Sequence, residues 1–557
     1  MSSAEPSRKR TRRSWAPLAA VAGLSVAAFG LSGTAEAAPP RPAVTVQLLN
    51  VSDWHGQLDP LNGVGGAAVI SSYWKADRAT NPNTITFTAG DAFGASPPLA
   101  GFFNEEPAVR SMRLMGFDFD GLGNHNWDKG NAHLQKMITI AGAPLGGTES
   151  GTPFRYLSAN LGQVEANLTG VAPWTIIERG GVKIGFVGVT NPEAPTLVFP
   201  GNFGTISVLD PIRAANKARS EVLKRGARAV VLIAHMGVTG LDATGAPVGP
   251  LVDLAKGVGD FDLVVGDHTD VQYSGTIDDK LVYENRSKGA TYAKATLMLD
   301  QQNGKVRTKS VAFVTPTAAG VTPDPVIVGY LAPLRVQLAA AFDGKVGTAQ
   351  GRFPRGSNVE RGGEAAIGNL VADSMRVKYG TQLALTNAGG LRAALPSSYV
   401  PLAVGLDRLD PAPYDIVLGD VFAVLPFGNQ VVTRTVTGTQ LWAALENGVS
   451  QIASTTCLGV DGRFPQISGF TFTFSCTAAA GSRVLSVALT GGGPIARDAT
   501  AYTFATNDFV NNGGDSYTVF KDGQGVSRDL MANVLRDHIT TLGSITPVIE
   551  GRIVKAP

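Results

Sequence analysis

From residue 44 to about 323 the chain repeats one pattern of hydrophobic and polar positions. A short run rich in β-branched and aromatic residues is followed by a loop containing Gly, Asn or Asp, and then by a stretch with helical spacing. This alternation predicts a layered α/β arrangement. Six strands are expected, at residues 44–49, 84–88, 117–121, 182–189, 229–234 and 261–265.

The pattern changes near Asp324-Pro325. An Ala-, Leu- and Val-rich segment at 326–342 predicts a helix that joins two regions. A second α/β region is expected after it, with helices at 364–378 and 439–450 and strands at 382–386, 430–436 and 502–506. The predicted organisation is an N-terminal domain at 44–323, a helical linker at 324–345 and a C-terminal domain at 346–557.

The first 37 residues have the three-part layout of a secretory signal peptide. A basic stretch, Ser7 to Arg13, precedes an apolar run from Ala16 to about Leu31 and the small-residue triplet ending at Ala37. We expect cleavage near Ala37 and a secreted or cell-surface protein. Arg12-Arg13 leaves both the general and the twin-arginine export routes open.

Removing residues 1–37 takes away five Lys/Arg and two Asp/Glu, so the formal net charge changes from +2 to −1. This balance argues against a nucleic-acid polymer as partner. We also expect no membrane span in the mature chain, because no comparable apolar run follows the signal segment. The oligomeric state is left open.

The chain has two cysteines, Cys457 and Cys476. Outside the cell a disulfide is expected, and by the chain-entropy model it would contribute about 3 kcal/mol. The alternative is a pair of free thiols.

Five of the six predicted strands end directly at one of six short motifs that carry the candidate chemistry. The motifs are residues 52–56, 90–91, 123–128, 235–237, 266–270 and 387–392. Four of the six histidines lie within these motifs. Since loops at the carboxyl ends of neighbouring strands meet in one crevice, residues distant in sequence are expected to gather there. The candidate metal ligands are Asp53, His55, Asp91, Asn124, His235, His268 and Asp270.

Carboxylate, imidazole and amide ligands suit two divalent ions such as Zn or Mn, although the residues do not fix their identity. Asp91 has two oxygens and can bridge both ions, which would activate a water for attack on phosphorus. Asp53 and His55, two apart on a segment expected to be extended, should project to the same side. His125 is the expected acid or cation beside the reacting phosphate, oriented by Asp128.

Each motif alone has a simpler explanation, since Asp-x-His, Gly-Asp and His-x-Gly are also ordinary turn or capping sequences. Phe427 and Phe509 could be core residues, and Arg361 and Arg392 could be surface charges. All the motifs together, in this order along the chain, indicate a metal-dependent site more specifically than any one motif does.

That set resembles the metallophosphoesterase domain of the 5′-nucleotidase and UDP-sugar hydrolase family, whose pattern is Asp-x-His, Gly-Asp, Gly-Asn-His-x-x-Asp, a strand-end His and Gly-His-x-His/Gln. The resemblance implies an N-terminal α/β/β/α sandwich and a C-terminal nucleotidase domain. It implies that Asp53, His55, Asp91 and Asp270 bind one ion and that Asp91, Asn124, His235 and His268 bind the other, with His125 and Asp128 catalytic. Asp270 departs from the usual His or Gln, so its role as a ligand is open.

The C-terminal region resembles the family's substrate-binding domain through Arg361, the Asn387-x-Gly-Gly-x-Arg392 motif, the Pro426 to Asn429 segment, Asn507 to Phe509 and Gly513 to Tyr517. The resemblance implies that Arg361 and Arg392 hold phosphate, Phe427 and Phe509 sandwich a base and Asp515 binds ribose. Asn387 and Asn429 complete the expected substrate-binding set. Guanidinium forks suit phosphate, and two aromatic faces bind a base with little selectivity.

The resulting hypothesis is an exported two-metal phosphohydrolase that releases phosphate from nucleoside 5′-monophosphates by attack of a metal-bound water. UDP-sugar or dinucleotide pyrophosphate cleavage and 2′,3′-cyclic nucleotide hydrolysis are alternatives that use the same centre. A non-catalytic nucleotide-binding surface protein is the alternative of another class.

Overall fold

The structure is a computed structural model, and it describes residues 42–143, 150–454, 457 and 461–556. The predicted signal peptide at 1–37 lies outside the described residues. Strands pair in two sets, one before and one after the long helix α8 (Pro325–Phe342).

The first set forms two mixed sheets. One has the strand order β17 (Val306–Val314), β16 (Tyr292–Asp300), β1 (Ala43–Val51), β2 (Thr84–Thr88), β3 (Phe119–Gly121), β4 (Arg155–Leu157) and β6 (Val171–Ala172). The other has the order β14 (Tyr273–Ile277), β15 (Lys280–Glu284), β13 (Leu263–Val265), β10 (Ala229–Ala234), β8 (Val182–Val189) and β7 (Trp174–Arg179). In both sheets the central strands are parallel. Antiparallel strands lie at one edge of the first sheet and at both edges of the second.

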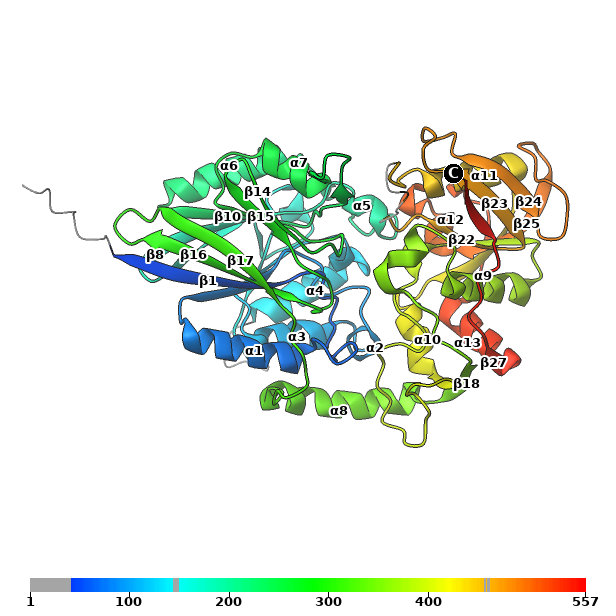
Figure 1. Cartoon of the computed structure of the whole chain (residues 1–557), viewed down its shortest axis with the longest axis horizontal. Coiled ribbons are helices and arrows are strands. Elements are labelled where there is room, and N and C mark those ends of the chain that lie inside the picture. Colours follow the sequence, from blue (N-terminus) through cyan, green and yellow to red (C-terminus); the bar gives the residue numbers. More distant parts are fainter. Residues whose placement is uncertain (1–41, 144–149, 455–456, 458–460, 557) are drawn as a thin grey trace, which may run out of the picture. The chain divides into compact units, whose positions relative to one another are not determined.

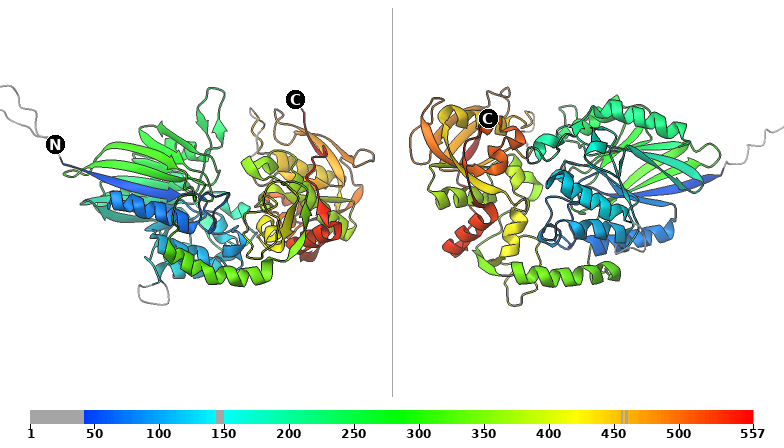
Figure 2. Two further views of the ribbon diagram at one scale, coloured as in Figure 1. Left: turned by 60° about the horizontal axis from the view of Figure 1, so that its bottom comes forward. Right: turned by 180° about the vertical axis from the view of Figure 1, so that it is seen from behind.

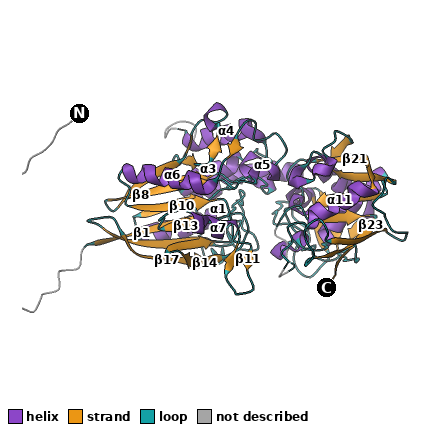
Figure 3. Ribbon diagram, turned by 90° about the horizontal axis from the view of Figure 1, so that it is seen from above, coloured by secondary structure: helices purple, strands orange, loops and turns teal. Residues whose placement is uncertain are grey.

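Hydrophobic residues from both sheets, such as Leu48, Phe87, Phe186 and Val231, pack into one buried cluster between them. The outer face of the first sheet is covered by α1 (Ala67–Thr80), α3 (Glu106–Met115) and α4 (Gly130–Gly142), and the outer face of the second by α6 (Pro211–Lys224) and α7 (Pro250–Gly257). Figures 1 and 2 show these helix groups on opposite sides, and Figure 3 shows the strands running in one general direction. The layers are therefore α/β/β/α.

Helix α8 begins at a side-chain cap, where Asp324 accepts a hydrogen bond from the backbone N–H of Val326. Its residues Ile327, Leu331 and Leu338 join the cluster that contains α1 and α3. Among the described residues it is the one helix long and apolar enough to pass a length-and-composition test for a membrane span. That is weak evidence for a span, because core helices pass the same test.

The second set of strands includes a five-stranded sheet with the order β22 (Pro465–Ser468), β19 (Leu383–Asn387), β25 (Ala501–Asn507), β21 (Gln430–Thr437) and β26 (Val526–Leu530). Helices α9 (Ala366–Tyr379) and α13 (Met531–Leu542) contribute to the core on one side, and α11 (Gly438–Val449) to a separate core. Two three-stranded sheets complete this second set of strands. One has the order β20 (Tyr414–Val417), β18 (Lys345–Ala349) and β27 (Ser544–Ile545), and the other has the order β24 (Val484–Leu489), β23 (Phe470–Ser475) and β28 (Ile553–Ala556).

The predicted fold class is confirmed: an α/β/β/α sandwich precedes a helix and a second α/β region. The predicted disulfide is also present, between Cys457 and Cys476. The antiparallel strands β14 to β17 were not predicted. The domain limits at 323 and 345 stay predictions, although the strand pairing changes partners across α8.

Candidate metal centre and adjoining pocket

Asp53, His55 and Asp91 lie in tight turns just after β1 and β2. Their φ angles are 37°, 50° and 49°, so the expectation of an extended segment at Asp53 and His55 was wrong. The backbone N–H of His55 donates to the carbonyl of Asp91 at 2.9 Å, which pairs the two turns. The side chains still come together, with His55 Nε2 3.8 Å from Asp53 Oδ1.

His235 follows β10 and is the point where one predicted ligand set converges. Its Nε2 lies 2.9 Å from Asp91 Oδ2, 3.2 Å from Asn124 Oδ1 and 3.1 Å from His268 Nδ1. All four side chains of the set Asp91, Asn124, His235 and His268 therefore meet around one point. Two imidazole nitrogens and two oxygens at this spacing form a ligand set typical of a divalent cation.

The second predicted set adjoins the first. His55 Nδ1 lies 2.8 Å from the carbonyl oxygen of Gly94, an arrangement that makes Nδ1 the donor and directs the lone pair of Nε2 toward the cluster. Burial, and then the charge of Arg392, hold the pKa of His55 well below its usual value. A neutral imidazole is the form that binds metal.

The residues fit metal ions on electrostatic grounds as well. Three groups of buried or partly buried His and Asp side chains could each hold an ion, namely His55, Asp91 and His125; Asp91, His235 and His268; and Asp53, His235 and Asp267. Among the described residues, Asp91 Oδ2 and Asp267 Oδ2 are buried without a hydrogen bond of good geometry. Buried carboxylates gathered in this way require compensating positive charge.

The pKa values of two of these side chains are displaced from their usual values. Burial, and then the charge of Asp267, raise the pKa of Asp53 well above its usual value. Burial followed by the charge of His235 lowers the pKa of His268 to about 3. Bound cations would relieve the repulsion among the carboxylates and use the neutral imidazoles.

Asp267 was not predicted as a functional residue. It is fully buried, accepts a hydrogen bond from Ser52 Oγ, and its Oδ1 accepts the backbone N–H of His268 at 3.0 Å. Its position directly after the buried strand β13 was the available signal, but its contact with Ser52 spans 215 residues and no local pattern reveals it.

His125 and Asp128 form the predicted pair. His125 Nδ1 lies 3.0 Å from both carboxylate oxygens of Asp128, and Asp128 Oδ2 also accepts the backbone N–H of Ala95 at 2.8 Å. The backbone N–H of His125 donates to Asp91 Oδ1 at 2.9 Å. The imidazole is thus held through Nδ1 beside Asp91, the predicted bridging ligand.

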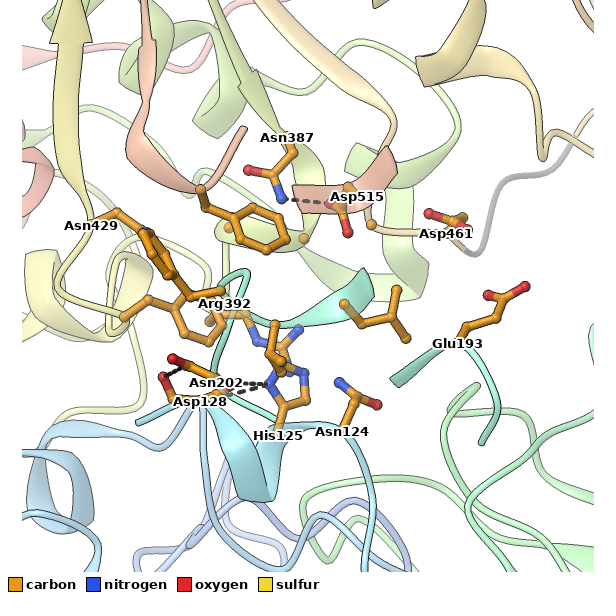
Figure 4. Close-up of a pocket in the computed structure, with 18 of the residues that line it drawn as sticks. Asn124, His125, Asp128, Glu193, Asn202, Asn387, Arg392, Asn429, Asp461 and Asp515 are labelled. Carbon is orange, nitrogen blue, oxygen red and sulfur yellow. Dashed lines mark hydrogen bonds and ion pairs between the residues drawn. The ribbon is translucent and has the colours of Figure 1, made fainter. Parts of the chain in front are cut away.

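A cavity of about 350 Å³ adjoins the metal ligands (Figure 4). It is lined by predicted residues from both regions of the chain: Asn124, His125, Asp128, His268, Arg361, Asn387, Arg392, Phe427, Asn429, Phe509 and Asp515. Its size is that of a small-molecule site.

Arg392 lies next to the predicted metal ligand His55. Its Nη2 is 3.3 Å from His55 Nε2, and the side chain is nearly buried. Burial, and then the charges of Arg355 and Arg361, lower the pKa of Arg392 to about 10. Several guanidinium groups held together in this way form a strong site for an anion such as phosphate.

Phe427 and Phe509 both line the cavity and are half-buried. Phe427 stacks over His125 with ring centroids 5.8 Å apart, whereas Phe509 also packs against a core cluster. Asn429 Nδ2 donates to Asp508 Oδ1 at 2.7 Å. The alternative of pure core packing does not describe Phe427, since its ring faces the cavity.

Asn387 and Asp515 are joined in a buried network. Asn387 Nδ2 donates to Asp515 Oδ2 at 2.7 Å, and Asn387 Oδ1 accepts from Asn507 Nδ2 at 3.0 Å. Asp515 is 4% exposed. The network fixes the carboxylate at the cavity wall.

Asp270 occurs in none of the three candidate ligand groups of the described residues. Burial would raise the pKa of Asp270, but a hydrogen bond from Ser287 and the charges of Arg355 and Arg361 outweigh it, and the pKa is lowered. Its role as a metal ligand stays a prediction.

Similarities to known proteins agree with the geometry of this site. Residues 345–522 match the family model described as 5′-nucleotidase, C-terminal domain. In solved structures the chain is similar to a 5′-nucleotidase precursor from Thermus thermophilus, with 27% identity, a TM-score of 0.76 and coverage of 92% of this chain and 99% of that one.

Among curated proteins, the chain is 26% identical to the cell wall protein Lmo0130 of Listeria monocytogenes over 590 residues, covering 96% of this chain and 72% of that protein. It is 27% identical to the endonuclease YhcR of Bacillus subtilis over 485 residues, covering 85% of this chain. The chain spans only 37% of the length of YhcR. Together with the α/β/β/α sandwich and its His/Asp clusters, the matched C-terminal domain and the similarity to a 5′-nucleotidase precursor over almost its whole length make this chain similar to the 5′-nucleotidase family.

Proposed function

We propose that this protein releases phosphate from nucleoside 5′-monophosphates. One observation carries the proposal: a single cavity is lined at one part by Asn124 and His125 and at another by Phe427, Phe509 and Asp515. The first part suits a phosphate ester beside metal ions, and the second suits a nucleoside. A nucleoside monophosphate presents both groups in one small molecule.

The chain's own side chains have distinct tasks in this reaction. Arg392 and Arg361 bind the phosphate oxygens and orient the ester toward the ligand cluster. His125 Nε2 donates a proton to the departing 5′-oxygen, while Asp128 accepts the Nδ1–H and keeps the ring in place. Phe427 and Phe509 hold the base.

Two divalent ions would be held by Asp53, His55 and Asp91, and by Asp91, Asn124, His235 and His268, with Asp270 and Asp267 as candidates to complete the first set. When bound, such ions supply Lewis acidity that activates a water and neutralises charge on phosphorus. Both Zn²⁺ and Mn²⁺ suit these oxygen and nitrogen ligands.

We also propose that the protein acts outside the cytoplasm. The N-terminal sequence has the layout of a signal peptide, and the Cys457–Cys476 disulfide is of the kind that persists in oxidising compartments. N-terminal sequencing of protein collected from the culture medium or cell surface should begin near residue 38.

The activity is tested by separating and quantifying the hydrolysis products of AMP, UDP-glucose and 2′,3′-cyclic AMP, with added Mn²⁺ or Zn²⁺. We expect AMP to give the highest kcat/KM. A preference for UDP-glucose would indicate a pyrophosphatase, and a preference for the cyclic nucleotide would indicate a phosphodiesterase. Inactivity on all three, with nucleotide binding retained, would support the non-catalytic alternative.

A further inference from the structure

The loop closed by the Cys457–Cys476 disulfide reaches the same cavity. Its residues Asp461 and Gly462 line the cavity next to Asp515 and Gly389. The backbone N–H of Gly389 donates to the carbonyl of Gly462 at 2.8 Å, and that of Ala388 to Phe464 at 2.8 Å. The disulfide loop is therefore bonded directly to the Asn387 to Arg392 segment.

The Asp461 side chain has a fixed orientation. Its Oδ1 accepts both the backbone N–H of Arg463, at 2.9 Å, and Arg463 Nε, at 3.0 Å. Among the hydrogen bonds of the described residues, none reaches Asp461 Oδ2. One carboxylate oxygen thus anchors the side chain, and the other is left for a molecule in the cavity.

Asp461 and Asp515 lie close to each other. A Cβ built on Gly462 would lie 3.4 Å from Asp515 Oδ2 and 3.1 Å from the Cα of Gly389, so glycine at 462 allows the loop to approach this closely. Burial, and then the charge of Asp461, raise the pKa of Asp515 to about 7. Figure 4 shows both carboxylates on one side of the cavity.

Two carboxylates at one wall repel each other unless a ligand supplies donors to both. A ribose ring offers two neighbouring hydroxyl groups, and each can donate one hydrogen bond to a carboxylate. Asp515 Oδ2 is already occupied by Asn387, which leaves its Oδ1, just as Asp461 leaves its Oδ2.

We propose that Asp461 is a second ribose-binding residue, that Asp461 and Asp515 each accept a hydrogen bond from one hydroxyl of the ribose diol, and that the protein therefore selects ribonucleosides over deoxyribonucleosides. The proposal rests on the proposed nucleotidase function and specifies its substrate class. A site built to bond a hydroxyl rejects the analogue that lacks it, because a buried acceptor is then left without a donor.

The test is calorimetric binding of adenosine, 2′-deoxyadenosine and 3′-deoxyadenosine to the metal-loaded protein. The wild type should bind adenosine at least about tenfold more tightly than either deoxy analogue. In Asp461→Asn, the two bonds from Arg463 hold the amide oxygen in place of Oδ1, so an NH₂ donor replaces the free acceptor. This variant should bind adenosine and one of the two analogues within about threefold of each other.

Asp253→Asn is the matched control, because Asp253 is an exposed carboxylate on α7 that does not line the cavity. It should keep the wild-type preference. Equal binding of all three nucleosides by the wild type, or an unchanged preference in a folded Asp461→Asn, would overturn the proposal.

The loop tether provides an independent variant. Cys457→Ser/Cys476→Ser should weaken adenosine binding about tenfold while leaving hydrolysis of p-nitrophenyl phosphate, a monoester without ribose, unchanged. Unaltered adenosine binding would count against the loop's role. The nucleoside-binding measurements are separate from the AMP hydrolysis assay. A protein that selects adenosine but does not hydrolyse AMP would refute the proposed function and support the ribose site.

Discussion

Nucleoside binding should strengthen as the pH rises through 7, because the ribose hydroxyls are expected to donate to Asp515 in its ionised form. In the free protein, burial and the neighbouring Asp461 raise the pKa of Asp515 to about 7. Arg463 and Arg361 are the cations that oppose this shift. Below pH 7 most Asp515 carboxyl groups carry a proton. This proton must leave before the two ribose hydroxyls can donate one hydrogen bond to Asp515 and one to Asp461.

The magnitude follows from the ionised fraction. With a pKa near 7, about a tenth of the Asp515 side chains are ionised at pH 6 and about nine tenths at pH 8. If the nucleoside binds only the ionised form, its apparent affinity should increase about tenfold over this interval, or about 1.4 kcal/mol. Above pH 8 the affinity should level off.

Adenosine is the suitable probe, because the phosphate of AMP itself titrates near pH 6 and would add a second dependence. Calorimetry between pH 5.5 and 8.5 should give a flat profile for Asp515→Asn. Asp461→Asn should keep the rise but move its midpoint to lower pH, since the repelling charge is gone. A wild-type affinity that is constant, or that falls, between pH 6 and 8 would refute the reasoning.

Further predictions concern the catalytic pair, the base site and the metals. Asp128→Asn should lower kcat for AMP by about 10²- to 10⁴-fold with unchanged metal content by elemental analysis, whereas loss of metal would show that Asp128 acts in ion binding. Phe427→Ala should raise KM about 5- to 150-fold for AMP, GMP and UMP alike in steady-state assays, and an effect on one base alone would contradict a stacking role. Extensive chelation should abolish phosphate release and Mn²⁺ or Zn²⁺ should restore it, so full activity in the chelated protein would exclude a metal-dependent reaction.

The hydrophobic pattern was sufficient to predict the strands that carry the ligands. Each of β1, β2, β10 and β13 is a short apolar run that ends at a polar motif, and the parallel pairing of these strands within each sheet brings the motifs to one edge. The strands at 273–314 were missed. One of these, β17, lies at a sheet edge with one partner strand, and none of its positions is fully buried, so its hydrophobic signal is weak.

The local geometry at Asp53 and His55 was not predictable from spacing. An extended segment would place both side chains on one face, but a backbone bond from His55 to Asp91 imposes a turn with positive φ instead. The contributions of Asp267 and Asp461 were missed for a related reason. Each depends on a contact with a residue far away in sequence, Ser52 for Asp267 and the Gly389 segment for the Asp461 loop.

The segment from Asp91 to Ala95 joins the candidate metal centre to the proposed catalytic pair, His125 and Asp128. Asp91 Oδ1 accepts the backbone N–H of His125, the Gly94 carbonyl accepts His55 Nδ1–H, and the Ala95 N–H donates to Asp128. Gly94 has a φ of +96°, and a Cβ there would lie 2.2 Å from the carbonyl oxygen of His125, so only glycine allows this approach. One short loop therefore sets the tautomer of a proposed metal ligand, His55, and the position of the proposed proton donor, His125. A change at either residue should therefore alter the geometry of the other.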